Sequence, residues 1–514
     1  MKLNIGSYLE KLNRRKNGKG TKCIWILSYL YLTVPCMIFI IGWLGLRYSI
    51  PMTILIIFCM YKIFQDLPET WVPEWNQDNI VKAIVILFLI GVWVYFSGVG
   101  KYVFQNEDHG VRNVLFNILV ENEWPVINYD ILPKNEGAGA TALIYYIGFW
   151  LPAAIVGKAF GLEAGYAFQA FWAILGIVLF YYFICSRMKK ICIWPLIVFV
   201  FFSGWDIVGQ YLIGTNLFIM ENDLHLEWWI SSYQYSSITT QLFWVFNQAV
   251  PAWLCTIMLY LQKNNRSAIF ILACCMIQGT FPFVGLFALT CFWIFTRVEW
   301  IENKESSRIK NYIKSIMKGT CTIQNIVGGG IIGLVSFGYL IGNKSGGVIM
   351  KAVEEKPYLA NSLFKLIVFV ILEVGIYFII LYKYNKKNML YYVSLAALCV
   401  IPLVRVGSSA DFCMRVSIPF LIILYIYVID ALQKSWIKKD KILWMALFGT
   451  LLIGSVTPVH EFTRTVKNTV ASLNEGRAPE ILNEDEEEMK TKILNGENFS
   501  GVIDENRFYK YFVK

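Results

Sequence analysis

Two adjacent carboxylates, an imidazole and a guanidinium fall within six residues of one another: Glu107, Asp108, His109 and Arg112. They follow a long apolar run, in a region where most neighbouring residues are hydrocarbon-like. A carboxylate can act as a general base towards a hydroxyl group, and a guanidinium can stabilise developing negative charge. We therefore regard Glu107 and Asp108 as candidate catalytic residues, and His109 and Arg112 as candidate substrate-binding residues.

Further segments carry ionisable or amide side chains at positions that the hydropathy pattern assigns to the same side of a membrane. They are Asp206, His225 and Glu227, Asn247 and Gln248, and Asp411 and Arg415. Polar groups at membrane depth are costly and mark function by default. Amides and carboxylates suit the recognition of sugar hydroxyl groups, and a guanidinium suits a forked contact with phosphate. We interpret all of these as candidate substrate-binding residues.

Each candidate also has a structural interpretation. Glu107 and Asp108 could cap a solvated loop, and a histidine such as His109 is more often structural than catalytic. Asp206 could pair with a neighbouring helix, and Arg415 could extend to lipid phosphate groups at the membrane surface. Their joint assignment to one side of the membrane is what favours a shared site.

The composition indicates a membrane protein. Of 514 residues, 57% are hydrophobic and only 16% are charged, whereas a soluble protein carries about 25% charged residues. Apolar runs of about 20 residues recur along the chain, and each could cross a hydrocarbon core of about 30 Å. The net charge of +10 lies in short loops, where it sets orientation in the lipid bilayer. We therefore expect no nucleic acid partner.

We expect an all-α fold, a polytopic transmembrane helical bundle of about 13 crossings, within a range of about 11 to 14. The count includes the runs 191–213 and 390–404. It is least certain at 50–64 and at the short neighbouring runs 268–279 and 283–295.

The apolar segment Thr141–Phe160 decides the orientation of everything that follows it. If this segment crossed the membrane, the later basic loops would all fall outside, against the usual bias of Lys and Arg to the inside. Pro152 and Lys158 also disfavour a crossing. We therefore place the segment on the outer surface, among outer juxtamembrane helices, with the N-terminus cytoplasmic and the C-terminus extracytoplasmic.

This orientation divides the chain into three parts. The parts are a basic cytoplasmic N-terminus at 1–22, a transmembrane domain at 23–460 and an extracytoplasmic polar tail at 461–514. Within the transmembrane domain we expect an outer catalytic loop at 100–161, an outer loop at 214–241 and an inner amphipathic loop at 298–320.

No cofactor is assigned with certainty. The twelve cysteines include no CxxC pair, and most fall in or beside apolar runs, where they act as small apolar residues. The acidic pair Glu107 and Asp108 could hold a divalent metal, but its spacing is not specific for one. The metal ligands are therefore unknown.

The order of these parts resembles that of the C-type (GT-C-like) polytopic membrane glycosyltransferases, which use polyprenyl-phosphate-linked sugars. Glu107-Asp108 follows a span, and Leu143-Ile144-Tyr145-Tyr146 and Lys158-Ala159-Phe160-Gly161 come next. The resemblance covers about residues 80–190. The phrases 202–206, 247–253 and 411–415 are similar to those of uncharacterised bacterial membrane proteins of this kind.

The resemblance implies that Asp108 or Glu107 is the catalytic base and that Arg415 contacts the lipid phosphate. We expect an enzyme that transfers a sugar from a polyprenyl-phosphate carrier to a cell-envelope glycan or other acceptor on the outer face of the cell membrane.

Two alternatives remain open. One is an O-antigen or capsule-type polysaccharide polymerase, although the outer loop 214–241 contains no Lys or Arg. The other is a polysaccharide or lipid transporter. Apart from Lys365 and Glu373, however, charges within spans are scarce, and we see no internal repeat of the kind that many transporters contain.

Overall fold

The computed structural model describes residues 20–129, 140–213, 225–230, 232–300, 307–343, 363–406, 410–479, 486–496, 498–504 and 506–514. Most of the expected N-terminal segment 1–22 and the first part of the expected outer loop 214–241 lie outside these ranges.

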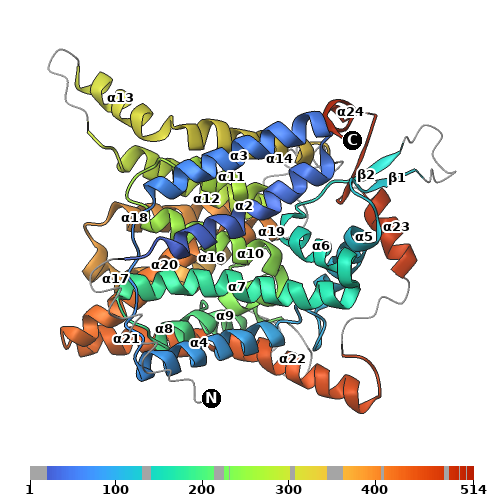
Figure 1. The fold of residues 1–514 in the computed structure, drawn as a ribbon. Helices are drawn as coiled ribbons and strands as arrows, with labels where there is room; N and C mark the ends of the chain where they lie inside the picture. Colours follow the sequence, from blue (N-terminus) through green and yellow to red (C-terminus); the bar gives the residue numbers. More distant parts are fainter. Residues whose placement is uncertain are drawn as a thin grey trace, which may run out of the picture.

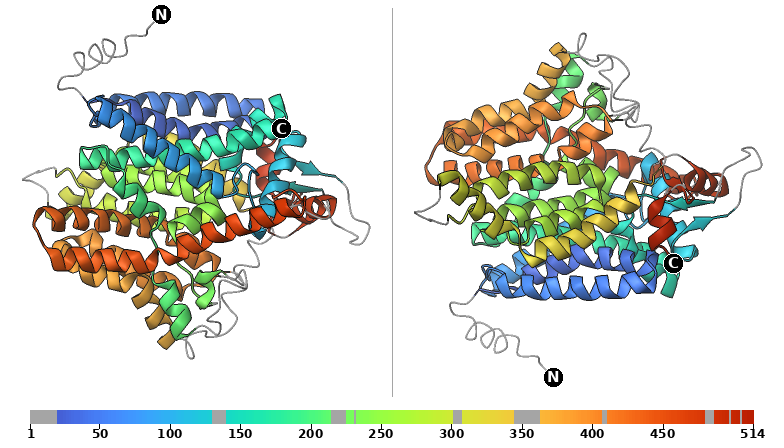
Figure 2. Two further views of the ribbon diagram at one scale, coloured as in Figure 1. Left: turned by 90° about the horizontal axis from the view of Figure 1, so that it is seen from below. Right: turned by 90° about the horizontal axis from the view of Figure 1, so that it is seen from above.

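The fold is a bundle of long helices that run side by side, with small elements at one end (Figures 1 and 2). The structure is 75% helical and nearly all-α, which confirms the expected class. Within the described residues, eight helices are long and apolar enough to cross a membrane. They are α2 (Cys23–Trp43), α3 (Leu46–Asp66), α4 (Gln77–Phe96), α7 (Leu162–Met188), α10 (Ile238–Leu261), Leu363–Asn385, α20 (Ile418–Ile437) and Lys441–Asn474. Leu363–Asn385 comprises α16 (Leu363–Val370), a π-helical turn and α17 (Ile376–Asn385).

The expected count of about 13 crossings is not confirmed. The structure supports eight, or nine if the bent pair α13 (Arg308–Thr320) and Gln324–Leu340, which includes α14 (Gly330–Leu340), is one span. Several apolar runs form short helices instead: α8 (Trp194–Val200), α9 (Asp206–Leu212), α11 (Ala268–Met276), α12 (Thr280–Thr296) and α18 (Met389–Val400). A helix of 17 residues rises about 25 Å, which is less than the hydrocarbon core. Hydropathy alone does not reveal whether an apolar residue faces lipid or protein.

One end of the bundle carries a three-stranded antiparallel sheet, and we call it the sheet end (Figure 1). The strands are β1 (Ile127–Asn128), β2 (Thr141–Leu143) and β3 (Ser500–Val502), with Thr141 opposite Val502 and Leu143 opposite Ser500. Helices α5 (Glu107–Glu121), α6 (Leu151–Phe160), α23 (Glu486–Asn495) and α24 (Arg507–Phe512) lie beside it. The C-terminal tail therefore packs on the segment that contains the acidic pair.

The segment Thr141–Phe160 does not form a helix of membrane length. Its helical part, Gly148–Phe160, has 13 residues and rises about 20 Å. This helical part packs against α7, and the two helices approach closely at Gly157 and Gly165. A Cβ added to Gly165 would lie 3.0 Å from the Cα atom of Gly157. Lys158 then donates from Nζ to the carbonyl oxygen of Val120, 3.1 Å away, at the end of α5. These contacts keep α6 at the sheet end.

The opposite end of the bundle carries the amphipathic helix α13 (Figure 1). Its exposed apolar residues Ile309, Ile313 and Met317 are spaced four apart and form one stripe. Lys310 and Lys314 lie beside that stripe. Such a helix suits a position at a membrane surface, as expected for the segment 298–320.

Helix α10 lies at the centre of the bundle and is interrupted in its middle. Val245 has non-helical dihedral angles (φ −137°, ψ 34°). Pro251 has no N–H group to donate to the carbonyl of Asn247. The break exposes backbone polar groups inside the bundle, and α5 packs against it.

Candidate functional site

The start of α5 is fixed to the break in α10. Asn106 donates from Nδ2 to the carbonyl oxygen of Phe243 at 2.7 Å, and His109 contacts the same oxygen through Nε2 at 2.8 Å. Nδ1 of His109 lies 3.2 Å from the amide Nε2 of Gln105. Burial, with the nearby charge of Arg112, lowers the pKa of His109 to about 4. His109 is therefore neutral, and its hydrogen bond to Phe243 holds α5 against α10.

Asp108 is the carboxylate of the acidic pair that faces a cavity. Its side chain is 40% exposed and accepts a hydrogen bond from Nη2 of Arg112 at 2.7 Å. Burial opposes ionisation, but the guanidinium groups of Arg112 and Arg415 outweigh it and hold the pKa of Asp108 below its usual value. Glu107 is exposed on the first turn of α5 and does not line this cavity. Of the acidic pair, Asp108 is therefore the residue that a ligand in the cavity can reach.

Arg415 approaches Asp108 from helix α19 (Asp411–Val416). It donates from Nη2 to Asp411 at 3.0 Å and from Nη1 to the hydroxyl of Tyr146 at 3.1 Å. Burial lowers its pKa, but Tyr146 and Asp411 outweigh this and leave the pKa of Arg415 above its usual value. Arg415 is therefore a permanent, oriented cation.

Both guanidinium groups retain unused donors. Among the described residues, Nε of Arg415 and Nη1 of Arg112 are buried without a hydrogen-bond partner. An unpaired buried N–H group is costly, so such donors mark a place for an acceptor. Neither arginine lines the cavity beside Asp108, but guanidinium N–H groups are strong donors to a phosphate oxygen.

The cavity beside Asp108 has a volume of about 330 Å³, within the usual range for small-molecule sites. Its walls come from α5, α10, α19 and the loop around a 3-10 helix, η2 (Leu226–Trp229). The lining residues are Asp108, His225, Trp228, Ile230, Tyr233, Gln234, Trp244, Ala410, Asp411 and Met414. Aromatic faces, an amide and two carboxylates are therefore available to a polar ligand.

A buried ionic cluster fixes one wall of this cavity. His225 contacts Glu461 through Nδ1 at 2.8 Å and Glu227 through Nε2 at 3.2 Å. Although burial lowers the pKa of His225, the two carboxylates raise it to about 10. Glu461 also accepts hydrogen bonds from Trp244 and Arg464. The cluster joins the loop around His225 to α22 (Val456–Asn474).

Asp206 does not reach the cavity. It is buried and accepts hydrogen bonds from the hydroxyl groups of Ser203, 3.0 Å away, and Thr457, 2.7 Å away. Glu373 lies beside it and accepts a hydrogen bond from Nε1 of Trp229 at 3.1 Å. No partner for Glu373 could be predicted from its position in the sequence, and the structure places it against residues 144 or more positions away.

Asn247 and Gln248 lie next to the break in α10 and are 0% and 1% exposed. Neither residue lines the cavity. Among the described residues their amide groups have no hydrogen-bond partners. Gln248 packs against Gly279, whose added Cβ would lie 3.1 Å from the Cβ of Gln248.

The structure therefore gathers only part of the expected set around the cavity. Asp108, His225 and Asp411 line it, Arg112, Glu227 and Arg415 support it, and His109 fastens α5. The structure adds five further residues to the site, for which no role could be predicted from the sequence: Tyr146, Gln234, Trp244, Glu461 and Arg464. The pair Glu461 and Arg464 could have been noticed as opposite charges three residues apart on one helix.

Metal binding has no further support. Within the described ranges, no group of three or more His, Cys, Asp or Glu side chains is arranged to hold a metal ion. The guanidinium of Arg112 already occupies one oxygen of Asp108.

Comparison of the chain with protein-family models, curated proteins and solved structures finds no match.

Proposed function

We propose that this protein is a membrane glycosyltransferase that moves a sugar from a polyprenyl-phosphate carrier to a glycan or other cell-envelope acceptor. In this proposal the sheet end faces the outside of the cell membrane, with the N-terminus cytoplasmic and the C-terminus extracytoplasmic. One observation carries the proposal. A partly exposed, ionised carboxylate lies on a cavity wall beside two buried guanidinium groups that have unused donors.

The proposed reaction is an in-line displacement at the anomeric carbon. Asp108 accepts the proton of the acceptor hydroxyl while the oxygen of that hydroxyl forms a bond to the anomeric carbon. The bond between the carbon and the phosphate oxygen breaks, and the leaving phosphate takes the electron pair. The free N–H groups of Arg112 and Arg415 stabilise the charge that develops there. Displacement from the opposite face inverts the configuration.

Binding of the donor also prepares the base. The two guanidinium groups favour the deprotonated form of Asp108. A phosphate bound to them offsets their positive charge, which makes Asp108 more basic when the acceptor is present. The rings of Trp228 and Trp244 and the amide of Gln234 supply stacking faces and hydrogen bonds for the sugar.

The test is the variant Asp108→Asn, assayed for transfer from a panel of radiolabelled polyprenyl-phosphate hexoses and pentoses in isolated membranes. Loss of a general base should lower the rate by about 100- to 10,000-fold, while protein level and thermal stability stay close to wild type. The matched control is Asp78→Asn, in an exposed pair with Lys82 on α4, which should transfer normally.

A Glu107→Gln variant separates the two acidic residues. Because Glu107 does not line the cavity, its loss should cost much less than that of Asp108. Full activity of Asp108→Asn would refute the base assignment. A ladder of extended products, instead of a single addition, would favour the polysaccharide polymerase.

A further inference from the structure

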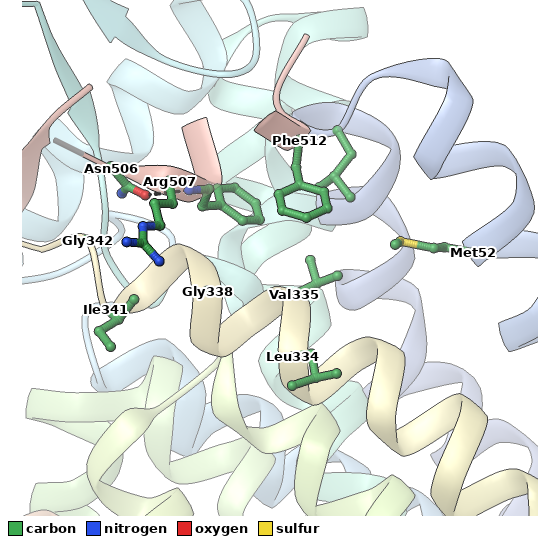
Figure 3. A pocket seen from close by; sticks show the side chains of 11 residues that line it. Met52, Leu334, Val335, Gly338, Ile341, Gly342, Asn506, Arg507 and Phe512 are labelled. Atoms are coloured by element: carbon green, nitrogen blue, oxygen red, sulfur yellow. Dashed lines mark hydrogen bonds between the residues drawn. The ribbon is translucent and has the colours of Figure 1, made fainter. Parts of the chain in front are cut away.

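A second cavity, of about 520 Å³, lies on the flank of the bundle between α3, α14 and the C-terminal helix α24. Figure 3 shows the ring of Phe512 above α14, with Met52 facing it from α3. Phe508 also lines this cavity. It shares no lining residue with the cavity beside Asp108. Its walls are largely apolar, and they include Leu44, Leu334 and Val335.

The cavity opens towards the surface that lipid would cover. Leu334 on α14 and Ile341 just after it are 74% and 65% exposed, and Leu46 at the start of α3 is 67% exposed. Exposed apolar side chains on the flank of a bundle of membrane-length helices face hydrocarbon. The natural occupant of such a groove is therefore a hydrocarbon chain.

The sheet end of the same groove is polar. Asn506 is 6% exposed; its Oδ1 accepts from the N–H of Phe508 at 2.8 Å, but its Nδ2 has no partner among the described residues. Arg507 is exposed, and no ion pair joins it to a carboxylate in the described part of the chain. In Figure 3 its side chain lies beside Asn506 and extends over the end of α14 at Ile341 and Gly342.

We propose that this groove binds an anionic phospholipid. One acyl chain lies between α3 and α14, and the phosphate group accepts hydrogen bonds from Arg507 and from Nδ2 of Asn506. The apolar walls match the chain, and the unused donors match the negatively charged headgroup. A zwitterionic lipid supplies the same chain but no net negative charge.

The bound lipid would strengthen the attachment of the C-terminus. At present α24 is held to the bundle by hydrogen bonds from Gly45 N–H to the carbonyl of Phe512, at 2.9 Å, and from Lys514 N–H to the carbonyl of Trp43, at 3.2 Å. A lipid that touches both α14 and α24 adds a second set of contacts between α24 and the bundle.

The experiment uses the purified full-length protein in nanodiscs. The probes are phosphatidylglycerol and phosphatidylcholine with identical acyl chains, each chain carrying a photoreactive diazirine. Phosphatidylglycerol should label peptides of α14 and α24 at least about fivefold more than phosphatidylcholine. A fivefold preference corresponds to a difference in binding free energy of about 1 kcal/mol. Arg507→Gln should reduce this preference to about one. Arg477→Gln, in an exposed pair with Glu475 on the same tail, should leave it unchanged.

A second variant fills the groove. A Cβ at Gly338 would meet only Phe508 at 3.5 Å, an ordinary contact, so Gly338→Leu should fold and exclude both lipids. Equal labelling by the two lipids in the wild-type protein would overturn the proposal. So would a retained preference in Arg507→Gln, which changes only an exposed side chain. These outcomes are independent of sugar transfer.

Discussion

At the scale of single residues, two aspartate–arginine pairs with the same spacing meet at the cavity. Asp108 pairs with Arg112 on α5, and Asp411 pairs with Arg415 on α19. In each pair the aspartate side chain is about 40% exposed and the arginine side chain about 10%. The carboxylates therefore face the cavity, and the guanidinium groups are held behind them in fixed positions.

Arg415→Lys tests whether this fixed geometry is needed. Lysine keeps the charge but has a single nitrogen. It therefore cannot bind Asp411 and Tyr146 through separate nitrogens and also present a third N–H group, in fixed geometry, to the phosphate. Under the proposed function, the KM for the polyprenyl-phosphate donor should rise by about tenfold, which corresponds to one lost charge-assisted hydrogen bond of about 1.5 kcal/mol. Steady-state kinetics in membranes measures this, and an unchanged KM would argue against phosphate contact.

His225 should make the stability of the protein depend on pH. Its pKa of about 10 in the folded state lies above the ordinary value of 6.5. Folding therefore favours the protonated ring, and this contribution is complete below about pH 6.5 and is lost as the pH rises through about 10. Thermal melts between pH 6.5 and 9.5 should show a falling Tm.

The variant His225→Gln removes that contribution. It leaves the buried Glu227 and Glu461 without their shared cation, so unfolding should become easier by about 3–5 kcal/mol at neutral pH. Its Tm should also vary less with pH than that of the wild type. A parallel pH profile in the two proteins would show that His225 is not the titrating group.

At the scale of elements, the interrupted helix α10 holds the short helix α5 in place. The break in α10 at Val245 leaves the carbonyl of Phe243 accessible, and α5 binds it through Asn106 and His109. The position of Asp108 therefore depends on α10 as much as on its own helix. A break inside a buried membrane-length helix commonly accompanies a binding site.

His109→Phe tests this connection. Phenylalanine preserves the ring stacked on Phe246 but removes the contact with the Gln105 amide and one of the two hydrogen bonds to the Phe243 carbonyl. We expect a loss of about 1–3 kcal/mol and faster hydrogen exchange in α5. Exchange in α7 should stay unchanged. Unaltered protection of α5 would show that His109 does not hold it.

At the scale of the whole molecule, the two ends of the bundle are chemically different. The sheet end carries the candidate site and the docked C-terminus, whereas the opposite end carries the basic helix α13 (Figure 1). The bias of Lys and Arg towards the cytoplasm supports an inner position for α13.

Cysteine labelling checks this orientation. In a background in which the exposed Cys23 and Cys321 are replaced by serine, Glu107→Cys should react with a membrane-impermeant maleimide in intact cells. Lys314→Cys, on an exposed position of α13, should react only after permeabilisation. Labelling of both positions in intact cells would refute the proposed orientation, and labelling of the second alone would reverse it.

Much of the fold class follows from local sequence. A run of about 20 apolar residues has few options other than a helix in lipid, so the long helices could be predicted. The two pairs four residues apart could also be predicted, because helical periodicity alone brings such residues together. Local hydropathy predicts a span at each of the short helices α8, α11 and α18, because it cannot distinguish a buried half-length helix from a crossing.

Only the tertiary structure decided which of these groups share a cavity. His225 and Glu461 are 236 residues apart, and Arg415 and Tyr146 are 269 apart. No periodicity connects positions so distant, because their contact depends on how whole helices pack. The same packing excludes Asp206 from the cavity and brings Asp108 and Arg415 together. The sequence by itself determined which chemical groups the helices carry, and helix packing determined which of them meet.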